Sequence, residues 1–221
     1  MTVLDFPGRI ACIVFTYGCN FRCPFCHNAG LVIHEADFID EEEIFSYLNK
    51  RKGILDGVCI SGGEPLLHAK DLFEFMRRVK DMGYLVKLDT NGSFPKELKY
   101  AIDNRLVDYV AMDIKNCEEK YAITAGVSEI DISKIKESIE IIMSSGVDYE
   151  FRTTVTRELH TPDDFAKIGE LIKGAKKHYI QNFKDSENLI LNSSSPLDNQ
   201  ALNSLLEAIS PYVELAAIRG Q

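Results

Sequence analysis

The sequence predicts an α/β fold with a parallel sheet, and two patterns support this prediction. Short apolar runs typical of buried strands alternate six times with segments whose apolar residues recur at helical spacing. Polar clusters directly follow several of these runs, as expected where functional groups gather at the carboxyl ends of parallel strands. Alternation alone fits both an open doubly wound sheet and a barrel, because both use right-handed crossovers.

The composition is that of a globular protein. With 221 residues and 45% hydrophobic content, the chain can bury a sizeable core, and we expect a single domain over residues 1–221. Its 25 basic residues are outnumbered by 34 acidic ones, and the net charge of -9 argues against a nucleic-acid partner. No apolar run approaches the length of a membrane span, so we expect a cytoplasmic protein without a membrane partner.

The first half of the chain contains four of the expected strands. They cover residues 10–15, 58–60, 85–88 and 107–114. Asp40 followed by Glu43 resembles a capping box and predicts a helix over residues 40–52. A second helix ends at Gly83, and a third begins near Pro95. The apolar stripe of the second helix consists of Leu72, Phe75, Met76 and Val79.

The second half continues the alternation. Strands are expected over residues 149–155 and 178–183, with a short closing strand over residues 213–218. The helix before the fifth strand ends at Gly146 and carries Ile132, Ile135, Ile139 and Ile142 on one face. Thr161 and Pro162 cap and open the next helix. The last helix is predicted to begin at Ser195-Pro196, with Leu202, Leu205, Leu206 and Ile209 inward.

Three of the six cysteines, Cys19, Cys23 and Cys26, are spaced C-x3-C-x2-C directly after the first strand. Thiolate sulfur is a soft ligand that selects zinc, copper(I) or iron-sulfur clusters. A structural zinc needs a fourth protein ligand, and His27 is too close to Cys26 to turn easily onto the same ion. A cubane cluster on three cysteines leaves one iron open, which makes the site catalytic. The spacing therefore favours a cluster over zinc.

The other cysteines are isolated. Cys12 and Cys59 lie in apolar runs and are expected to be buried small hydrophobic residues, while Cys117 follows a polar turn.

The cysteine loop resembles the cluster loop of the radical S-adenosylmethionine (radical SAM) enzymes, and the likeness continues along nearly the whole chain. Asp5-Phe6-Pro7-Gly8 before the first strand and Cys26-His27-Asn28 at the loop's end are similar to the short activating enzymes that install a glycyl radical. This resemblance implies a partial (β/α)6 barrel of radical SAM type. It also implies a 4Fe-4S cluster held by the three cysteines, with one open iron, and S-adenosylmethionine (SAM) as cofactor.

Gly62-Gly63-Glu64-Pro65 resembles the GGEP motif of this family, whose backbone contacts the amino group of the cofactor's methionine moiety. Glycines let a ligand approach the chain closely, and carbonyl or carboxylate oxygens suit an ammonium group. A Gly-Gly turn between a strand and a helix is commonplace on its own. The cysteine loop upstream is what favours the cofactor-binding interpretation.

Asp89, Thr90 and Asn91 after the third strand, and Asp113 and Lys115 after the fourth, resemble further cofactor-binding motifs of the family. In relatives the aspartates and the threonine lie beside the cofactor, in some around a monovalent cation, and the lysine meets its carboxylate. Hard oxygen ligands suit such a cation. The charged residues could instead form a structural ion-pair network. We favour function because Asp113 and Lys115 share side-chain parity on a strand.

Arg152 resembles the fifth-strand arginine that reaches the cofactor, and its planar charged fork suits a carboxylate or ribose oxygens. Without the family, pairing with a surface acid is nearly as good an explanation. Gln181 and Asn182 match the adenosine end more loosely. In the activating enzymes, the histidine after the third cysteine and the aspartate of the N-terminal segment meet the incoming glycine loop. The resemblance assigns that role to His27 and Asp5.

The resemblance thus implies reductive cleavage of SAM to a 5′-deoxyadenosyl radical, which removes a hydrogen atom from a glycine of a partner glycyl radical enzyme. Anaerobic ribonucleotide reductase is the expected partner, and a low-potential flavodoxin or ferredoxin the expected electron donor. One alternative is a radical SAM enzyme acting on a small molecule, of the purine-analogue synthase type, since such enzymes share the cluster loop and GGEP. The other is a non-catalytic, zinc-stabilised binding module.

Overall fold

The computed structural model describes residues 2, 5–32, 37–185, 189–190 and 194–219. Within them, seven strands form one sheet in sequential order, and every neighbouring pair is parallel. The strands are β1 (Ala11–Thr16), β2 (Gly57–Gly62), β3 (Leu85–Thr90), β4 (Tyr109–Asp113), β5 (Asp148–Val155), β6 (His178–Asn182) and β7 (Ala216–Arg219). No pairing in this part of the chain joins β7 to β1, so the sheet is an open, partial barrel, as predicted.

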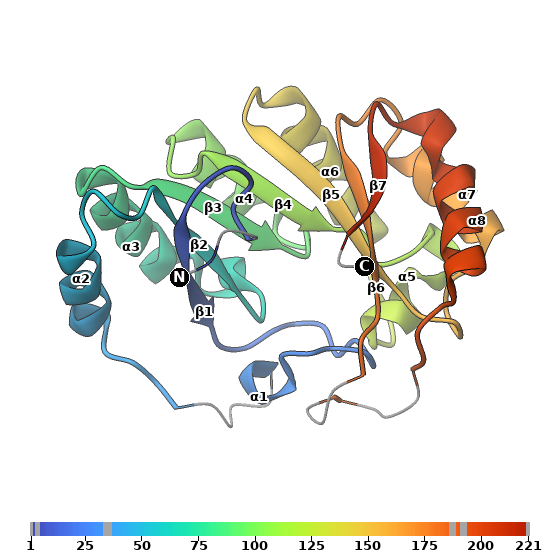
Figure 1. Cartoon of the computed structure of the whole chain (residues 1–221), viewed down its shortest axis with the longest axis horizontal. Helices are drawn as coiled ribbons and strands as arrows, with labels where there is room; N and C mark the ends of the chain where they lie inside the picture. Colours follow the sequence, from blue (N-terminus) through green and yellow to red (C-terminus); the bar gives the residue numbers. More distant parts are fainter. Residues whose placement is uncertain (1, 3–4, 33–36, 186–188, 191–193, 220–221) are drawn as a thin grey trace.

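Helices connect the strands and lie mainly outside the curved sheet, with α2 and α3 at one end and α7 and α8 at the other (Figure 1). The helices are α1 (Ala29–Val32), α2 (Glu41–Lys50), α3 (Ala69–Asp81), α4 (Pro95–Asp103), α5 (Glu118–Ala125), α6 (Ile132–Ser144), α7 (Pro162–Leu171) and α8 (Asn199–Ile209). Short 3-10 turns are η1 (Pro65–His68) and η2 (Ser210–Tyr212). None of the described helices combines the length and apolar character that crossing a bilayer requires.

The two faces of the sheet have different compositions because side chains alternate along each strand. The outer face, under the helices, belongs to the main core and includes Val58, Ile60, Val86, Leu88, Val110, Met112 and Phe151. The inner face has a smaller apolar cluster near the start of β1, consisting of Phe6, Ala11, Tyr109 and Ala111. Further along the strands, Cys59 pairs in register with Lys87, and Asp113 with Arg152. The charged groups of the sheet are therefore concentrated on the inner face.

The predicted start of the last helix was wrong, because α8 begins at Asn199 and not at Ser195. Asp198 caps the helix by accepting a hydrogen bond from the backbone N–H of Ala201 at 2.9 Å. The backbone N–H of Ser195 donates to Glu158 at 3.0 Å, and that of Leu197 donates to the side chain of Asn182 at 3.0 Å. These bonds hold the preceding residues in a non-helical conformation.

Helix α5 was not predicted. Its buried residues, Tyr121, Thr124 and Ala125, are at helical spacing, but they span little more than one turn and include a polar threonine, so the segment has no extended apolar stripe. Gly126 ends the helix with a left-handed backbone, at φ +66°.

The buried His178 on β6 predicts a pH-dependent stability. Its ring lies 3.0 Å from the hydroxyl of Thr153, and burial lowers its pKa from 6.5 to about 3. Between these pH values the histidine gains a proton only in the unfolded chain. The free energy of unfolding therefore has its full value above pH 6.5. As the pH decreases below 6.5, this free energy decreases by up to about 1.4 kcal/mol per pH unit. We expect His178→Leu to remove this slope in urea denaturation between pH 7 and pH 5. Identical slopes in both proteins would contradict the assignment.

Candidate functional site

The cysteine loop after β1 crosses the carboxyl ends of the other strands (Figure 1). Successive residues of the loop contact the segments that follow successive strands. The contacting pairs are Gly18 with Gly63 after β2, Asn20 with Asn91 after β3, Arg22 with Ala125 after β4, Phe25 with His160 after β5, and His27 with Phe183 after β6. The predicted polar clusters are therefore gathered at one edge of the sheet, under this loop.

The two glycines after β2 allow close packing against the cysteine loop. A Cβ on Gly62, whose φ is +119°, would lie 2.2 Å from the carbonyl oxygen of Thr16. A Cβ on Gly63 would lie 1.9 Å from the carbonyl oxygen of Gly18. The backbone N–H of Glu64 donates to that same Gly18 oxygen at 2.9 Å. Glycine is thus required here for the approach of two chain segments, whatever ligand binds nearby.

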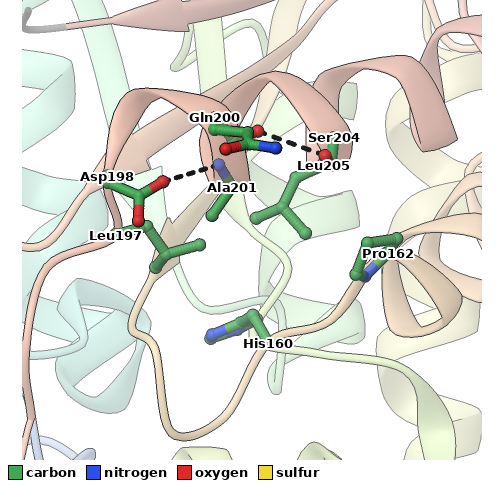
Figure 2. A pocket seen from close by; sticks show the side chains of 8 residues that line it. All are labelled: His160, Pro162, Leu197, Asp198, Gln200, Ala201, Ser204 and Leu205. Carbon is green, nitrogen blue, oxygen red and sulfur yellow. Dashed lines mark hydrogen bonds between the residues drawn. The ribbon is translucent and has the colours of Figure 1, made fainter.

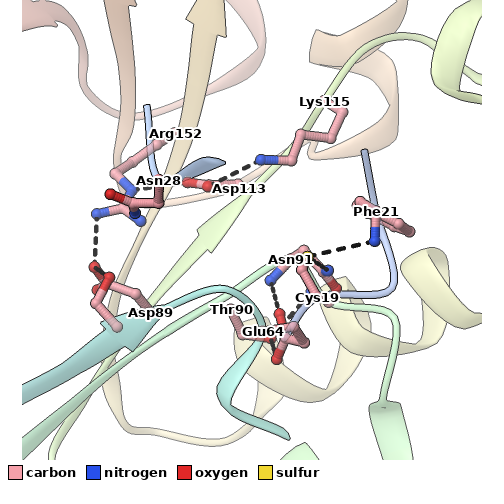
Figure 3. Close-up of polar contacts among 12 residues, drawn as sticks. Cys19, Phe21, Asn28, Glu64, Asp89, Thr90, Asn91, Asp113, Lys115 and Arg152 are labelled. Carbon is pink, nitrogen blue, oxygen red and sulfur yellow. Dashed lines mark hydrogen bonds and ion pairs between the residues drawn. The ribbon is translucent and has the colours of Figure 1, made fainter. Parts of the chain in front are cut away.

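The side chain of Glu64 joins the turns after β2 and β3 (Figure 3). One carboxylate oxygen accepts from the hydroxyl of Thr90 at 2.8 Å and from the N–H of Leu66 at 3.1 Å, and the other accepts from the N–H of Asn91 at 2.6 Å. Burial raises the pKa of Glu64 to about 7, while these three hydrogen bonds oppose the rise. Pro65 starts η1, so the motif lies at the junction of strand and turn.

Asn91 extends this connection to the cysteine loop. Its amide nitrogen donates to the side-chain oxygen of Asn20 at 3.0 Å and lies 3.9 Å from the sulfur of Cys19. Its oxygen accepts from the hydroxyl of Ser93 at 2.6 Å, and Ser93 in turn accepts from Asn20 at 2.9 Å. The first cysteine is therefore held beside the turn after β3.

The charged residues of the inner face form one ion-pair network (Figure 3). Arg152 donates to Asp113 at 2.9 Å and to Asp89 at 3.3 Å, and Lys115 donates to the other oxygen of Asp113 at 3.1 Å. Lys87, which is almost fully buried, also pairs with Asp89. Burial would raise the pKa of Asp113, but Arg152 and Lys115 lower it to about 2. Three cations thus surround two carboxylates, which leaves one excess positive charge.

Asp113 and Lys115 are in contact, but not for the reason that the sequence suggested, which was shared side-chain parity on one strand. Strand β4 ends at Asp113, so Lys115 lies in the following turn and its direction does not come from strand parity. The ammonium group of Lys115 nevertheless reaches Asp113, and it opposes the rise in pKa that burial causes for Cys19 and Cys23. Lys115 therefore lies between the charged network and the cysteine loop.

The thiols of the loop are partly or fully buried. Cys23 is 8% exposed, and burial raises its pKa to about 11. Cys19 accepts a hydrogen bond from the backbone N–H of Phe21 at 3.3 Å. In the described part of the chain, no three His, Cys, Asp or Glu side chains converge on a point that one metal ion could occupy. As expected, Cys12 and Cys59 are buried, and so is Cys117, but Cys59 lies on the inner face with the Lys87 ammonium group 3.8 Å from its sulfur.

The two residues assigned to a partner's glycine loop are in different places. His27 stacks on Phe183, with ring centroids 5.4 Å apart and planes 21° apart, and burial lowers its pKa. Asp5 accepts from the hydroxyl of Thr2 and precedes Phe6, which packs on Tyr109 near the amino ends of the strands. Their shared role stays a prediction.

The adenosine-end candidates also have protein partners. Both polar atoms of the Asn182 side chain bond to the backbone of Leu197, at 2.9 and 3.0 Å. Gln181 pairs in register with Arg219 on β7.

A cavity of about 350 Å³ lies between the segment before α7 and the start of α8 (Figure 2). Its lining consists of His160, Pro162, Leu197, Asp198, Gln200, Ala201, Ser204 and Leu205, and includes none of the residues predicted for the site. Sequence reasoning missed Asn20, Arg22, Gly126 and His160 as supports of the cysteine loop. Asn20 and Arg22 lie within the loop but carry no motif of their own, and Gly126 and His160 are far from it in the sequence, so no spacing rule identifies these four residues.

Comparison with known proteins decides the family. The profile of the Radical SAM superfamily matches residues 13–172. The chain belongs to the radical SAM superfamily. A Methanocaldococcus jannaschii protein named "Putative glycyl-radical enzyme activating enzyme" is 32% identical over 190 residues, which cover 85% of this chain and 78% of the relative.

Two further similarities are more limited. A "Probable GTP 3′,8-cyclase" of Saccharolobus islandicus is 32% identical over 136 residues, which cover 58% of this chain and 43% of that protein. The crystal structure of Streptococcus suis SuiB bound to precursor peptide SuiA superposes with a TM-score of 0.73 at 14% identity, over 98% of this chain and 50% of SuiB. This last likeness shows the shared fold, and the chain spans about half of SuiB.

Membership of the radical SAM superfamily implies a 4Fe-4S cluster and SAM, and the described residues fit both. The cysteine loop offers soft sulfur donors close to one another, since, besides burial, Cys26 and Cys19 both help to raise the pKa of Cys23, and such donors suit an iron-sulfur cluster. The excess positive charge next to the loop suits the carboxylate of an amino-acid moiety.

Replacing Gly126 tests whether close packing of the end of α5 against Arg22 supports the cysteine loop. A Cβ on Gly126 would lie 1.9 Å from the carbonyl oxygen of Arg22, whereas a Cβ on Gly146, which has a similar φ of +77°, would meet nothing within 4 Å. We expect Gly146→Ala to lower the free energy of unfolding by about 1 kcal/mol through backbone strain alone. Gly126→Ala should cost about 3 kcal/mol and also reduce iron and sulfide incorporation. Urea denaturation and iron analysis measure both, and equal losses in the two variants would show that the contact with Arg22 is unimportant.

Proposed function

We propose that this radical SAM protein activates a glycyl radical enzyme. A 4Fe-4S cluster, once bound and reduced, supplies the electron that cleaves SAM to methionine and a 5′-deoxyadenosyl radical. The hydrogen atom is then taken from a glycine of the partner, which we propose to be anaerobic ribonucleotide reductase. The sequence similarity to a relative with an activating-enzyme name, over most of both chains, is the observation that carries this proposal.

The cysteine loop would hold the cluster, and the charged network beside it would bind SAM. Cys19, Cys23 and Cys26 would ligate the cluster through three of its irons and leave the fourth open for SAM. Lys115 lies beside this loop, so its ammonium group is suited to the SAM carboxylate. The backbone after β2, at Gly62 and Gly63, would accept from the SAM amino group.

The remaining network residues would orient the cofactor. Arg152 is held by Asp89 and Asp113, so its guanidinium group would present a fixed edge to the ligand. Asp89, Asp113 and Thr90 are the candidate ligands for a monovalent cation, although in the free protein the aspartates pair with basic side chains and Thr90 bonds to Glu64.

A second candidate function rests on the partial similarity to a GTP 3′,8-cyclase. Under this alternative, the same cluster and SAM would act on a small molecule. It predicts product formation by the purified protein without any partner protein, whereas the activating function predicts only slow SAM cleavage under those conditions.

Cysteine replacement tests the radical chemistry. Cys23 and Cys12 are buried to similar extents, at 8% and 7% exposure, but only Cys23 lies in the loop. After anaerobic reconstitution with iron and sulfide, we expect Cys23→Ala to lose the cluster and at least about 99% of 5′-deoxyadenosine formation, because a missing thiolate leaves an iron without its protein ligand. Cys12→Ala should retain both. Stoichiometric zinc and no cluster in the wild type would leave the binding-module interpretation instead.

Partner specificity is tested by electron paramagnetic resonance. Wild type, SAM, reductant and anaerobic ribonucleotide reductase should together give a glycine-centred radical that is absent when any component is omitted. His27→Ala should lower the radical yield several-fold while SAM cleavage continues, if His27 contacts the partner. His68→Ala, at a histidine bonded to the Tyr17 carbonyl oxygen, is the control. Turnover of a small substrate without a partner, and no radical on the reductase, would favour the second candidate.

A further inference from the structure

His160, in the connection between β5 and α7, has partners that fix the state of both ring nitrogens. The backbone N–H of Thr156 donates to Nδ1 at 3.2 Å, so Nδ1 carries no proton. Nε2 lies 2.9 Å from the carbonyl oxygen of Lys115, which can only accept, so Nε2 must be the donor. The ring is 4% exposed and is therefore a neutral, fully bonded imidazole inside the protein.

The same ring contacts the cysteine loop. Its centroid is 6.4 Å from that of Phe25, at 66° between planes, and Phe25 lies between Cys23 and Cys26. On another side it is 6.2 Å from Phe165 of α7. His160 thus joins the helix layer, the loop and the turn that carries Lys115.

The Lys115 turn depends on this connection for its position. Strand β4 ends two residues before Lys115, and the backbone N–H of the intervening Ile114 donates to the Arg152 carbonyl oxygen of β5 at 2.8 Å. The turn is then held from the β5–α7 connection by His160 and by a 2.9 Å bond from Asn116 to the carbonyl oxygen of Leu159. A fixed backbone limits the directions in which the Lys115 side chain can point.

We infer that His160 is a positioning residue, which holds the Lys115 turn and Phe25 so that the Lys115 ammonium group is fixed beside the cysteine loop for the carboxylate of SAM. The ligand named in this inference rests on the proposed function. In this role His160 acts through the Lys115 carbonyl oxygen and the Phe25 ring, and needs no contact of its own with the cluster or SAM.

The surroundings of His160 allow it to be replaced without rebuilding the sheet. The ring borders the cavity of about 350 Å³ and lies below Leu197 and Leu205 (Figure 2). A smaller or differently shaped polar side chain can therefore be accommodated next to this space.

Replacing His160 by Gln or by Asn tests its two hydrogen bonds, to Lys115 and to Thr156, one at a time. In His160→Gln, the amide nitrogen can occupy the place of Nε2 and donate to Lys115, but no acceptor remains for Thr156. In His160→Asn, the amide oxygen can replace Nδ1 and accept from Thr156, but nothing reaches Lys115. We expect His160→Asn to bind SAM about tenfold more weakly in anaerobic equilibrium dialysis with reconstituted protein, and His160→Gln to stay within about threefold of wild type.

Amide hydrogen exchange on the cluster-free protein gives an independent readout. The N–H of Cys117, which donates to the Asn116 side chain at 2.8 Å, reports on the Lys115 turn. The Cys117 N–H should exchange faster than in wild type in His160→Asn, and at the wild-type rate in His160→Gln. The Thr156 N–H should show the reverse. A purely structural role predicts instead that both variants lose SAM affinity together, in proportion to lost stability, and this result would overturn the inference.

His178 provides the matched control. It is also a buried histidine, and its ring lies 6.1 Å from the same Phe165, but its hydrogen-bond partner is Thr153. His178→Gln and His178→Asn should lower stability and leave SAM affinity per cluster unchanged. If the wild type binds no SAM, the proposed function fails and so does the ligand assigned to Lys115. Unchanged Cys117 exchange in His160→Asn would separately refute the positioning role.

Discussion

The site depends on holding an irregular loop against the ends of a sheet. A loop of this kind has few hydrogen bonds of its own, so its backbone groups must find partners elsewhere. Here the partner segments follow β2, β3, β4, β5 and β6 in turn, and Glu64 is central to them. Its backbone bonds to Gly18 and its buried carboxylate to Thr90 and Asn91. Because a buried donor left without a partner costs about 1–3 kcal/mol, displacement of this one side chain would loosen two turns and the cysteine loop together.

The same packing explains why the charged groups are already arranged before any ligand binds. Arg152 and Asp113 are neighbours in register on β5 and β4, and Asp89 comes from β3, so three strands fix one guanidinium group. Deeper on the inner face, Arg219 makes two bonds to the buried Glu150, at 2.7 and 2.9 Å. Ion pairs in such surroundings contribute little net stability after desolvation. Their value lies in geometry, because side chains that are already ordered lose little entropy when a ligand arrives.

The sequence predicted the repeating elements better than the contacts between them. Strand and helix positions follow from local apolar spacing, and the cysteine spacing pointed to the correct family. Helix α5 was missed because its buried face spans little more than one turn, and the start of α8 was misplaced because Ser195 and Leu197 bond to distant residues. The role of Glu64 in joining two turns, and that of His160 in supporting Lys115, depend on partners 26 to 45 positions away. Such partners are set by topology, which local patterns do not encode.

The edge of the sheet at β1 is open, and this bears on the size of substrate that the inner face can admit. Phe15 pairs in register with Ser61 and shares parity with Ala11, so it belongs to the inner face, yet it is 52% exposed at β1. A closed barrel would bury such a side chain against its neighbouring strand. Among the described strands, the inner face is therefore accessible beside β1, whereas ion pairs between β3, β5 and β7 fill the rest of it. If the substrate is a segment of another protein, as proposed, access from the side near β1 is compatible with its size, and the ordered charged groups can stay in place while it enters.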